Sequence, residues 1–296
     1  MNLLWLRIHP QHLAGFKAIA PVLYLLTGGV IAAWAYFSVV TPQRVGHYLT
    51  LHQALETLSI VVSALVFAVG WKAHSLNPQR NVLFLACGFL GVAILDFSHM
   101  LSFAGMPDYI TPNSVAKGIN FWLPARYLGA LTLLGAVALH WREQGDAADT
   151  GPGRFVMLAL VLAAVVAIHA VVFWFPQWYP QTYGAQGLTG FKIVAEYGIV
   201  ALYVASLVLL LRWARGRTAF DVARLFAAVW VMALSEVFFT LYVLATDIFN
   251  LLGHVYKVVG YYYLYRAIFV GTIEAPYRGL RQSDKAMRAV LDAVPD

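Results

Sequence analysis

The stretch NVLFLACGFLGVAI at residues 81–94 runs directly into LDFSHM at residues 95–100. The apolar part and its flanks are long enough to cross a bilayer, because a membrane-spanning helix needs about 20 mainly apolar residues. The second part places Asp96 and His99 inside the same segment, although an ionisable side chain there costs on the order of 2.5 to 3.5 kcal/mol to insert. The stretch therefore predicts a membrane helix whose polar groups have partners elsewhere in the chain.

Composition indicates that the whole chain is an integral membrane protein. Hydrophobic residues make up 61% of the 296 positions, charged residues make up 11%, and the mean hydropathy is +0.70. These values lie outside the range of soluble domains. The single cysteine, Cys87, excludes an intrachain disulfide and a cysteine-rich metal site. The N-terminal residues lack a signal-peptide cleavage site, so we expect residues 1–18 to be a cytoplasmic lead-in.

Eight apolar segments are long enough to span a membrane, and breaker-rich stretches such as GMPDYITPN and GDAADTGPG separate them. We therefore predict an all-α integral membrane protein, an eight-transmembrane-helix bundle within residues 19–274. The turn near Asp247 is the least distinct boundary. The predicted spans are 19–40, 50–72, 82–103, 121–141, 155–175, 191–213, 222–245 and 250–273.

The distribution of Lys and Arg predicts the orientation of these spans. With the N-terminus in the cytoplasm, the segments on the opposite side contain only Arg44 and Lys117, and the remaining loop and terminal Lys and Arg are cytoplasmic. The positive-inside rule then places both termini in the cytoplasm. The net charge of +6 follows from this topology, so the partner that it indicates is the lipid bilayer and not a nucleic acid.

Ionisable residues inside the predicted spans gather in the extracytoplasmic half. Several of them are spaced i,i+3 or i,i+4, so each such pair shares one helix face. We predict that these faces meet in one polar chamber. Its members are His52 and Glu56, Asp96 and His99, Arg126, Lys192 and Glu196, Glu236, and His254 and Lys257.

The chamber has the donor types of a metal site in a helical bundle. We predict one metal ion held by His52, Asp96, His99 and His254, with Glu56 or Glu236 close by. Nitrogen and oxygen donors without thiolate favour zinc, copper or iron. Because a ligand imidazole must be neutral, occupancy should fall as the pH drops through roughly 6.5.

Two alternatives to a single metal ion remain at this point. Haem b would fit if two of the histidines faced each other across about 4 Å of axial ligation. The chamber residues would instead form a buried ionic network if they bound only one another. In either case the planar guanidinium of Arg126 is expected to hold the carboxylate of Asp96 or Glu236 through a bidentate interaction.

The chain changes character after Pro276. Apolar residues at Leu280, Met287, Leu291 and Val294 fit a short coiled-coil seam, which predicts a homodimer of the full-length protein through residues 275–296. The alternative is a single amphipathic helix on the membrane surface. The final residues AVLDAVPD look like the lead-in helix of a PAS domain, so we expect a cytoplasmic signalling helix here.

Several ordered polar motifs also resemble a known family. The segments HQALETLSIVVSALVF, LDFSHMLSFAGMPD, NFWLPARYLGA, SEVFFTLY and LLGHVYKVVGYYYLYRAIF, followed by PYRGL, are similar to the bacterial membrane-associated sensor domains of the MASE type, most closely the third such family. The similarity spans roughly residues 45–280. The matching polar positions are His52, Glu56, Asp96, His99, Trp122, Arg126, Glu236, His254 and Lys257, among which Trp122, Arg126 and Lys257 are candidates to contact a cofactor.

The resemblance implies an input domain in the bacterial inner membrane. Such domains precede a histidine kinase, a diguanylate cyclase or a phosphodiesterase, often with PAS domains between, which connects them with two-component or cyclic di-GMP signalling. The resemblance implies no particular ligand. The alternatives are a haem- or metal-containing redox enzyme and, less favoured, a transporter. No nucleotide, phosphate or nucleophile motif is present, so we expect no catalytic turnover from this fragment.

Overall fold

The computed structural model describes most of the chain as helix. The described residues are 8–41, 44–76, 79–138, 153–185, 187–216 and 221–274, together with 277, 279, 281, 283–285, 287 and 288. Among them, the only named strands are β1 (Tyr183–Gly184) and β2 (Gly187–Leu188), which pair antiparallel in a short hairpin.

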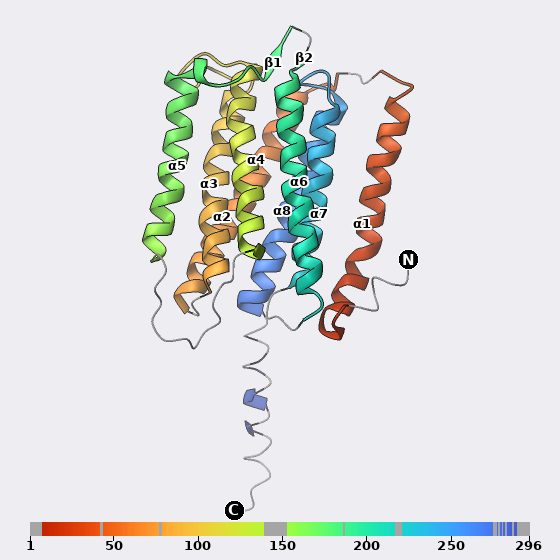
Figure 1. Cartoon of the computed structure of the whole chain (residues 1–296), viewed down its shortest axis with the longest axis vertical. Coiled ribbons are helices and arrows are strands. Elements are labelled where there is room, and N and C mark those ends of the chain that lie inside the picture. The colour runs from red at the N-terminus through yellow and green to blue at the C-terminus, as the bar shows by residue number, and fades with distance from the viewer. Residues whose placement is uncertain are drawn as a thin grey trace, which may run out of the picture.

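The described residues contain eight long helices (Figure 1). Seven of them, α1 to α7, are long and apolar enough to cross a membrane. The eighth helix is less apolar because it carries His254, Lys257 and several tyrosines. The chain is therefore an all-helical, multi-pass membrane protein. The bounds are α1 (Pro10–Phe37), α2 (Tyr48–Leu76), α3 (Arg80–Ser102), α4 (Val115–Ala138), α5 (Arg154–Trp174), α6 (Gly190–Trp213), α7 (Val222–Leu241) and α8 (Ile248–Phe269).

Six of the helices form a closed ring. Each packs against the next in the order α2, α3, α4, α6, α7 and α8, and α8 packs back against α2. The remaining two helices lie outside this ring, because α1 packs on α7 and α5 packs on α3 and α4. Figure 1 shows α1 and α5 at opposite edges of the bundle. Apart from His12 near the start of α1, the buried ionisable residues of these helices come from the ring helices, and the two outer helices are mainly apolar.

Small residues allow the ring helices to approach closely. A Cβ atom at Gly88 of α3 would overlap the side chain of Thr132 on α4. A Cβ atom at Gly253 of α8 would lie 2.6 Å from the ring of Phe239 on α7. Membrane helices use such small residues because packing contacts replace the hydrophobic effect between helices in lipid.

The predicted spans agree with the helices except at some ends. The first helix begins at Pro10 and ends at Phe37, whereas the sequence predicts a lead-in up to residue 18 and a span at 19–40. The segment PQHLAGFK contains enough helix-forming residues to extend the helix beyond its apolar part, and proline is favoured at a first helical position. The fourth helix begins at Val115 and not at residue 121. Hydropathy finds the part of a helix in lipid, and these helices extend past it.

The turn near Asp247 has a definite structure. The seventh helix ends at Leu241, four residues before the predicted boundary, and α8 begins at Ile248. The buried carboxylate of Asp247 accepts hydrogen bonds from the backbone N–H groups of Val243, Leu244 and Asn250. It therefore caps the N-terminus of α8 and gives the backbone N–H groups of the preceding turn a hydrogen-bond acceptor.

The bundle continues beyond α8 toward the C-terminus. The π-helix η3 (Val270–Glu274) follows α8 directly, and the described positions between 277 and 288 are helical. Met287 is among them, whereas Leu280, Leu291 and Val294 of the predicted coiled-coil seam lie outside the described residues.

The contact between Gly88 and Thr132 gives a test of the ring. We expect Gly88→Ala to destabilise the protein by about 1 to 3 kcal/mol, because overpacking forces the close pair α3 and α4 apart. The measurement is the thermal unfolding midpoint in detergent. Gly28→Ala in α1 is the matched control, because nothing lies within 4 Å of a Cβ atom there. Equal midpoints for the two variants would contradict the described approach of α3 and α4.

Candidate metal centre

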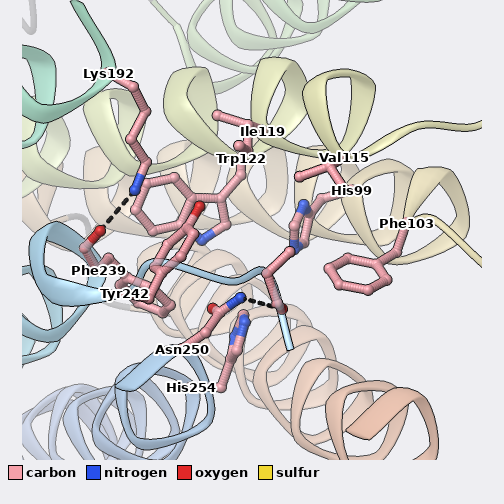
Figure 2. Close-up of a pocket in the computed structure, with 11 residues that line it drawn as sticks. His99, Phe103, Val115, Ile119, Trp122, Lys192, Phe239, Tyr242, Asn250 and His254 are labelled. Carbon is pink, nitrogen blue, oxygen red and sulfur yellow. Dashed lines mark hydrogen bonds between the residues drawn. The ribbon is translucent and has the colours of Figure 1, made fainter. Parts of the chain in front are cut away.

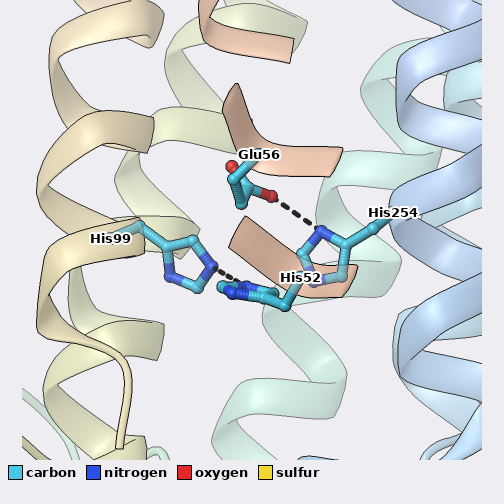
Figure 3. A group of neighbouring side chains, drawn as sticks. All are labelled: His52, Glu56, His99 and His254. Atoms are coloured by element: carbon cyan, nitrogen blue, oxygen red, sulfur yellow. Dashed lines mark hydrogen bonds and ion pairs between the residues drawn. The ribbon is translucent and has the colours of Figure 1, made fainter. Parts of the chain in front are cut away.

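Three histidines and one glutamate meet inside the ring near one end of the bundle. His52 and Glu56 come from α2, His99 from the last turn of α3 and His254 from α8, and Figure 3 shows them facing one another. Each can offer one ligand atom such that all of these atoms lie within 4.8 Å of one another. All four side chains are buried. The predicted convergence of the three histidines is therefore present.

The spacing of the donor atoms fits one small ion. The Nε2 atoms of His52 and His99 lie 3.2 Å apart. Two nitrogen ligands at about 2.0 to 2.1 Å from a tetrahedral metal are separated by roughly 3.3 to 3.4 Å. Nδ1 of His254 lies 2.7 Å from Oε1 of Glu56, so these two atoms need only a small separation to share the same ion.

The protein orients these imidazoles through their surroundings. Nδ1 of His99 lies 2.8 Å from the carbonyl oxygen of Gly118, to which it donates, and this leaves Nε2 of His99 as an acceptor. The ring of His52 packs against the rings of Phe103 and Tyr48 at centroid distances of 4.3 and 5.8 Å. A backbone carbonyl that fixes the tautomer of a histidine is a common second partner of metal-ligating histidines.

The buried charges form ion pairs beside this cluster. Nη2 of Arg126 lies 2.6 Å from each carboxylate oxygen of Asp96. Nζ of Lys257 lies 2.7 and 2.8 Å from the two oxygens of Glu56 and 3.2 Å from Oδ2 of Asp96. Lys257 therefore links the carboxylates of α2 and α3, and the ionic network that the sequence leaves open is present together with the histidine cluster.

The pairing of Arg126 with Asp96 is as predicted, but its geometry differs. One guanidinium nitrogen contacts both oxygens, and Nε of Arg126 has no hydrogen-bond partner among the described residues, so the fork-to-fork arrangement is absent. Asp96, predicted as a metal ligand, lies outside the group of possible ligands. Asp96 lies three residues before His99 on the same side of α3, but its carboxylate binds Arg126 on α4.

A second buried group lies across the ring from the histidines. Nζ of Lys192 on α6 lies 2.5 Å from Oε1 of Glu196 and donates to the carbonyl oxygen of Phe239 on α7 at 2.6 Å (Figure 2). Glu236 on α7 is also buried. Within the part of the chain that the structure describes, it does not belong to the group of possible metal ligands. Lys192 and Glu196, which their i,i+4 spacing places on one helix face, pair with each other in the interior.

The ring interior holds buried groups of both charge types. Three cations, Arg126, Lys192 and Lys257, face four carboxylates. The net charge of this interior therefore depends on how many of the carboxylates are protonated. The carboxylates are Glu56, Asp96, Glu196 and Glu236.

The residues predicted to contact a cofactor lie around the cluster. The Trp122 ring has Lys192 Nζ at 5.5 Å and the Arg126 guanidinium at 5.9 Å from its centroid. The haem alternative fits poorly, because His52 and His99 are closer than the roughly 4 Å that two axial ligands require. The cavity beside His99 and His254 measures about 20 Å³, which is far too small for a porphyrin.

Two contacts near the cluster were not predicted. Ser98 lies next to His99, and its hydroxyl is 2.7 Å from Nε2 of His169 on α5, while Nδ1 of His169 lies 2.8 Å from the carbonyl of Val165. The second contact joins Nδ1 of His99 to the carbonyl oxygen of Gly118. Spacing along one helix predicts a shared face but not the partner on another helix, so neither contact had a signal in the sequence.

These features define a class of protein: a multi-pass helical membrane protein whose closed ring buries an ionisable centre. The family model of the membrane-associated sensor domain MASE3 matches residues 43–276. Because this match covers more than half of the chain, the chain belongs to this family of membrane-associated sensor domains. No curated protein and no solved structure matches the chain. The matched range contains the whole ring and the histidine cluster, and α1 lies before it.

The Asp96 ion pair predicts that Arg126 does not tolerate lysine. Lysine keeps the charge but loses the planar group that lies 5.4 Å from the ring centroid of Tyr261, and its ammonium is more strongly hydrated. We expect Arg126→Lys to lower the thermal unfolding midpoint in detergent. Arg224→Lys is the control, because the Arg224 pair with Asp221 is partly exposed and such pairs contribute at most about 1 kcal/mol. An unchanged midpoint for Arg126→Lys would show that the ion pair does not depend on the guanidinium.

Proposed function

We propose that this chain is a metal-responsive sensory input domain of a bacterial inner-membrane signalling protein. A zinc, copper or iron ion would bind to His52, Glu56, His99 and His254. The observation that carries this proposal is the convergence of these four buried ligand groups, from three different helices, to within 4.8 Å. The family match supports the sensory role, and the cluster supports a metal ion as the stimulus.

The donor set supports a divalent ion. Imidazole nitrogens and a carboxylate oxygen bind zinc, copper and iron. Neutral histidines bring no charge, so the carboxylate of Glu56 is the one acidic group of this donor set. A metal ion would also satisfy Nε2 of His52 and His99, which otherwise share one hydrogen bond.

The proposed topology has eight spans with both termini in the cytoplasm. The start of α1 and the end of α8 lie at the same end of the bundle in Figure 1, which agrees with an even number of crossings. The histidine cluster lies toward the other end, since His52 is near the start of α2 and His99 near the end of α3. The asymmetry of Lys and Arg makes that other end extracytoplasmic. The sensor domain would then run from the start of α1 to residue 274.

The proposed signal passes through α8. This helix carries His254 and Lys257 on its inner face, η3 follows it directly, and the described positions between 277 and 288 are helical. Binding at the cluster would shift α8 relative to α2 and α3, and residues 275–296 would transmit this movement. The output would be a histidine kinase or diguanylate cyclase module, with a PAS domain between, and the fragment itself would have no catalytic turnover.

Metal binding by the purified protein tests this proposal. We expect about one zinc or cobalt ion per chain, and we expect His52→Ala, His99→Ala and His254→Ala each to weaken binding strongly, because each removes one ligand. His169→Ala is the matched control, because His169 is a histidine of a neighbouring helix that bonds Ser98 and lies outside the cluster. The measurement is metal content after dialysis together with a competition titration.

The pH dependence gives a second readout of the same site. Protons compete with the metal for imidazole, so the affinity should fall as the pH is lowered. The proposal fails if the wild-type protein retains no metal, or if His169→Ala loses as much metal as the three cluster variants.

The C-terminal helix gives a separate prediction about assembly. We expect the full-length protein to be a parallel homodimer, because signalling modules of this kind act as pairs and Met287 lies on the predicted seam. A single cysteine at Met287, in a Cys87→Ala background, should form crosslinked dimers in membranes. The control is a cysteine at Lys285, two residues away on another face of the same helix. Crosslinking that is equal at both positions, or absent at Met287, would contradict the seam.

A further inference from the structure

A small cavity adjoins the histidine cluster on one side. It measures about 20 Å³, and residues of α3, α4, α6, α7 and α8 and of the α7–α8 turn line it (Figure 2). A cavity needs roughly 10 to 15 Å³ in this measure to hold one water molecule. The space therefore fits a water molecule or another molecule of two or three atoms, and nothing as large as an amino acid.

The cavity borders the cluster at two of its histidines. His99 and His254 form part of its lining, whereas His52 and Glu56 do not. Glu56 is held by Lys257, which is not part of the lining either. An ion bound among the three histidines would therefore have protein ligands around it and this cavity next to it.

One polar group in the cavity wall has no partner. The indole N–H of Trp122 has no acceptor among the described residues, although the side chain is only 3% exposed. Figure 2 shows the indole nitrogen pointing toward the interior of the pocket. A buried donor without an acceptor costs about 1 to 3 kcal/mol, so its retention indicates an acceptor that occupies the cavity.

The rest of the lining defines what this acceptor can be. Phe103, Val115, Ile119 and Phe239 make most of the wall apolar. The ammonium of Lys192 also lines the cavity and gives it a positive wall, even though this group already contacts Glu196 and the carbonyl of Phe239. The cavity therefore suits a small neutral or anionic molecule with a lone pair at each end, one for the metal and one for the N–H of Trp122.

We propose that this cavity is the site of an exogenous ligand of the metal centre, and that the ligand belongs to the class of small anions with a lone pair at each end, represented by azide. This inference rests on the proposed metal site. The anion donates a lone pair to the metal and displaces a bound water molecule, so no electron is transferred. Trp122 donates a hydrogen bond to the distal atom, as donors in the ligand pockets of metal centres do.

The test uses the purified protein loaded with cobalt(II) and titrated with sodium azide. The visible bands of cobalt report whether the ion is bound, and their change on adding azide reports coordination of the added ligand. We expect saturable spectral changes with the wild-type protein. Trp122→Phe should keep the cobalt spectrum and weaken azide binding about tenfold, because it removes one hydrogen bond and keeps an aromatic ring.

Two further variants locate the ligand. Val115→Leu adds volume to the cavity wall without touching the cluster, and it should weaken azide binding while cobalt stays bound. Trp71→Phe, in α2 away from the cavity, should leave both unchanged.

Each outcome has a distinct meaning. Absence of the cobalt spectrum in the wild-type protein would overturn the proposed metal site and this inference with it. A cobalt spectrum that azide does not change would overturn this inference alone. Azide binding that is equal in wild type, Trp122→Phe and Val115→Leu would show that the ligand position lies elsewhere.

Discussion

An ionisable side chain at membrane depth needs a partner, and the arrangement of this protein follows from that constraint. The partners come from different helices: Asp96 on α3 binds Arg126 on α4, and Glu56 on α2 binds Lys257 on α8. Lys192 reaches from α6 to a backbone carbonyl of α7. These contacts fix the depth at which neighbouring helices meet. Removing one partner of such a buried pair typically costs about 3 to 5 kcal/mol, so the pairs also hold the ring closed.

The same constraint separates the ion pairs from the histidines. Asp96, Arg126 and Lys257 form ion pairs with one another, and an ionic network accounts for their burial. Neutral imidazoles contribute nothing to that balance. Three of them meet in one buried spot. Nδ1 of His99 is held by the carbonyl of Gly118, so Nε2 of His99 accepts the hydrogen bond from Nε2 of His52. A metal ion would replace this hydrogen bond and take both nitrogen atoms as ligands.

The sequence predicts the helices and the inward faces because both depend on local periodicity. The spacing of His52 from Glu56, and of Asp96 from His99, places each pair on one face, and the distribution of Lys and Arg places those faces at the same depth. Partner choice depends on the packing of helices that are distant in sequence. Hydropathy and spacing therefore could not show that Asp96 turns to α4 and away from the histidines. They could not show the contact of His169 with Ser98 either, nor that α1 begins at Pro10.

Glu56 connects the metal chemistry to the helix that leaves the domain. Its carboxylate contacts both His254 and Lys257, which lie one turn apart on α8. An ion bound by His52, His99 and His254 would compete with Lys257 for this carboxylate. Lys257 would then rely more on Asp96, at 3.2 Å, whose charge Arg126 already shares. Binding at one position of α8 would thus change the ion pairing at the next turn of the same helix. Since η3 follows α8 directly, a change in the position of α8 relative to α2 and α3 would also move η3, near the end of the range that the family model matches.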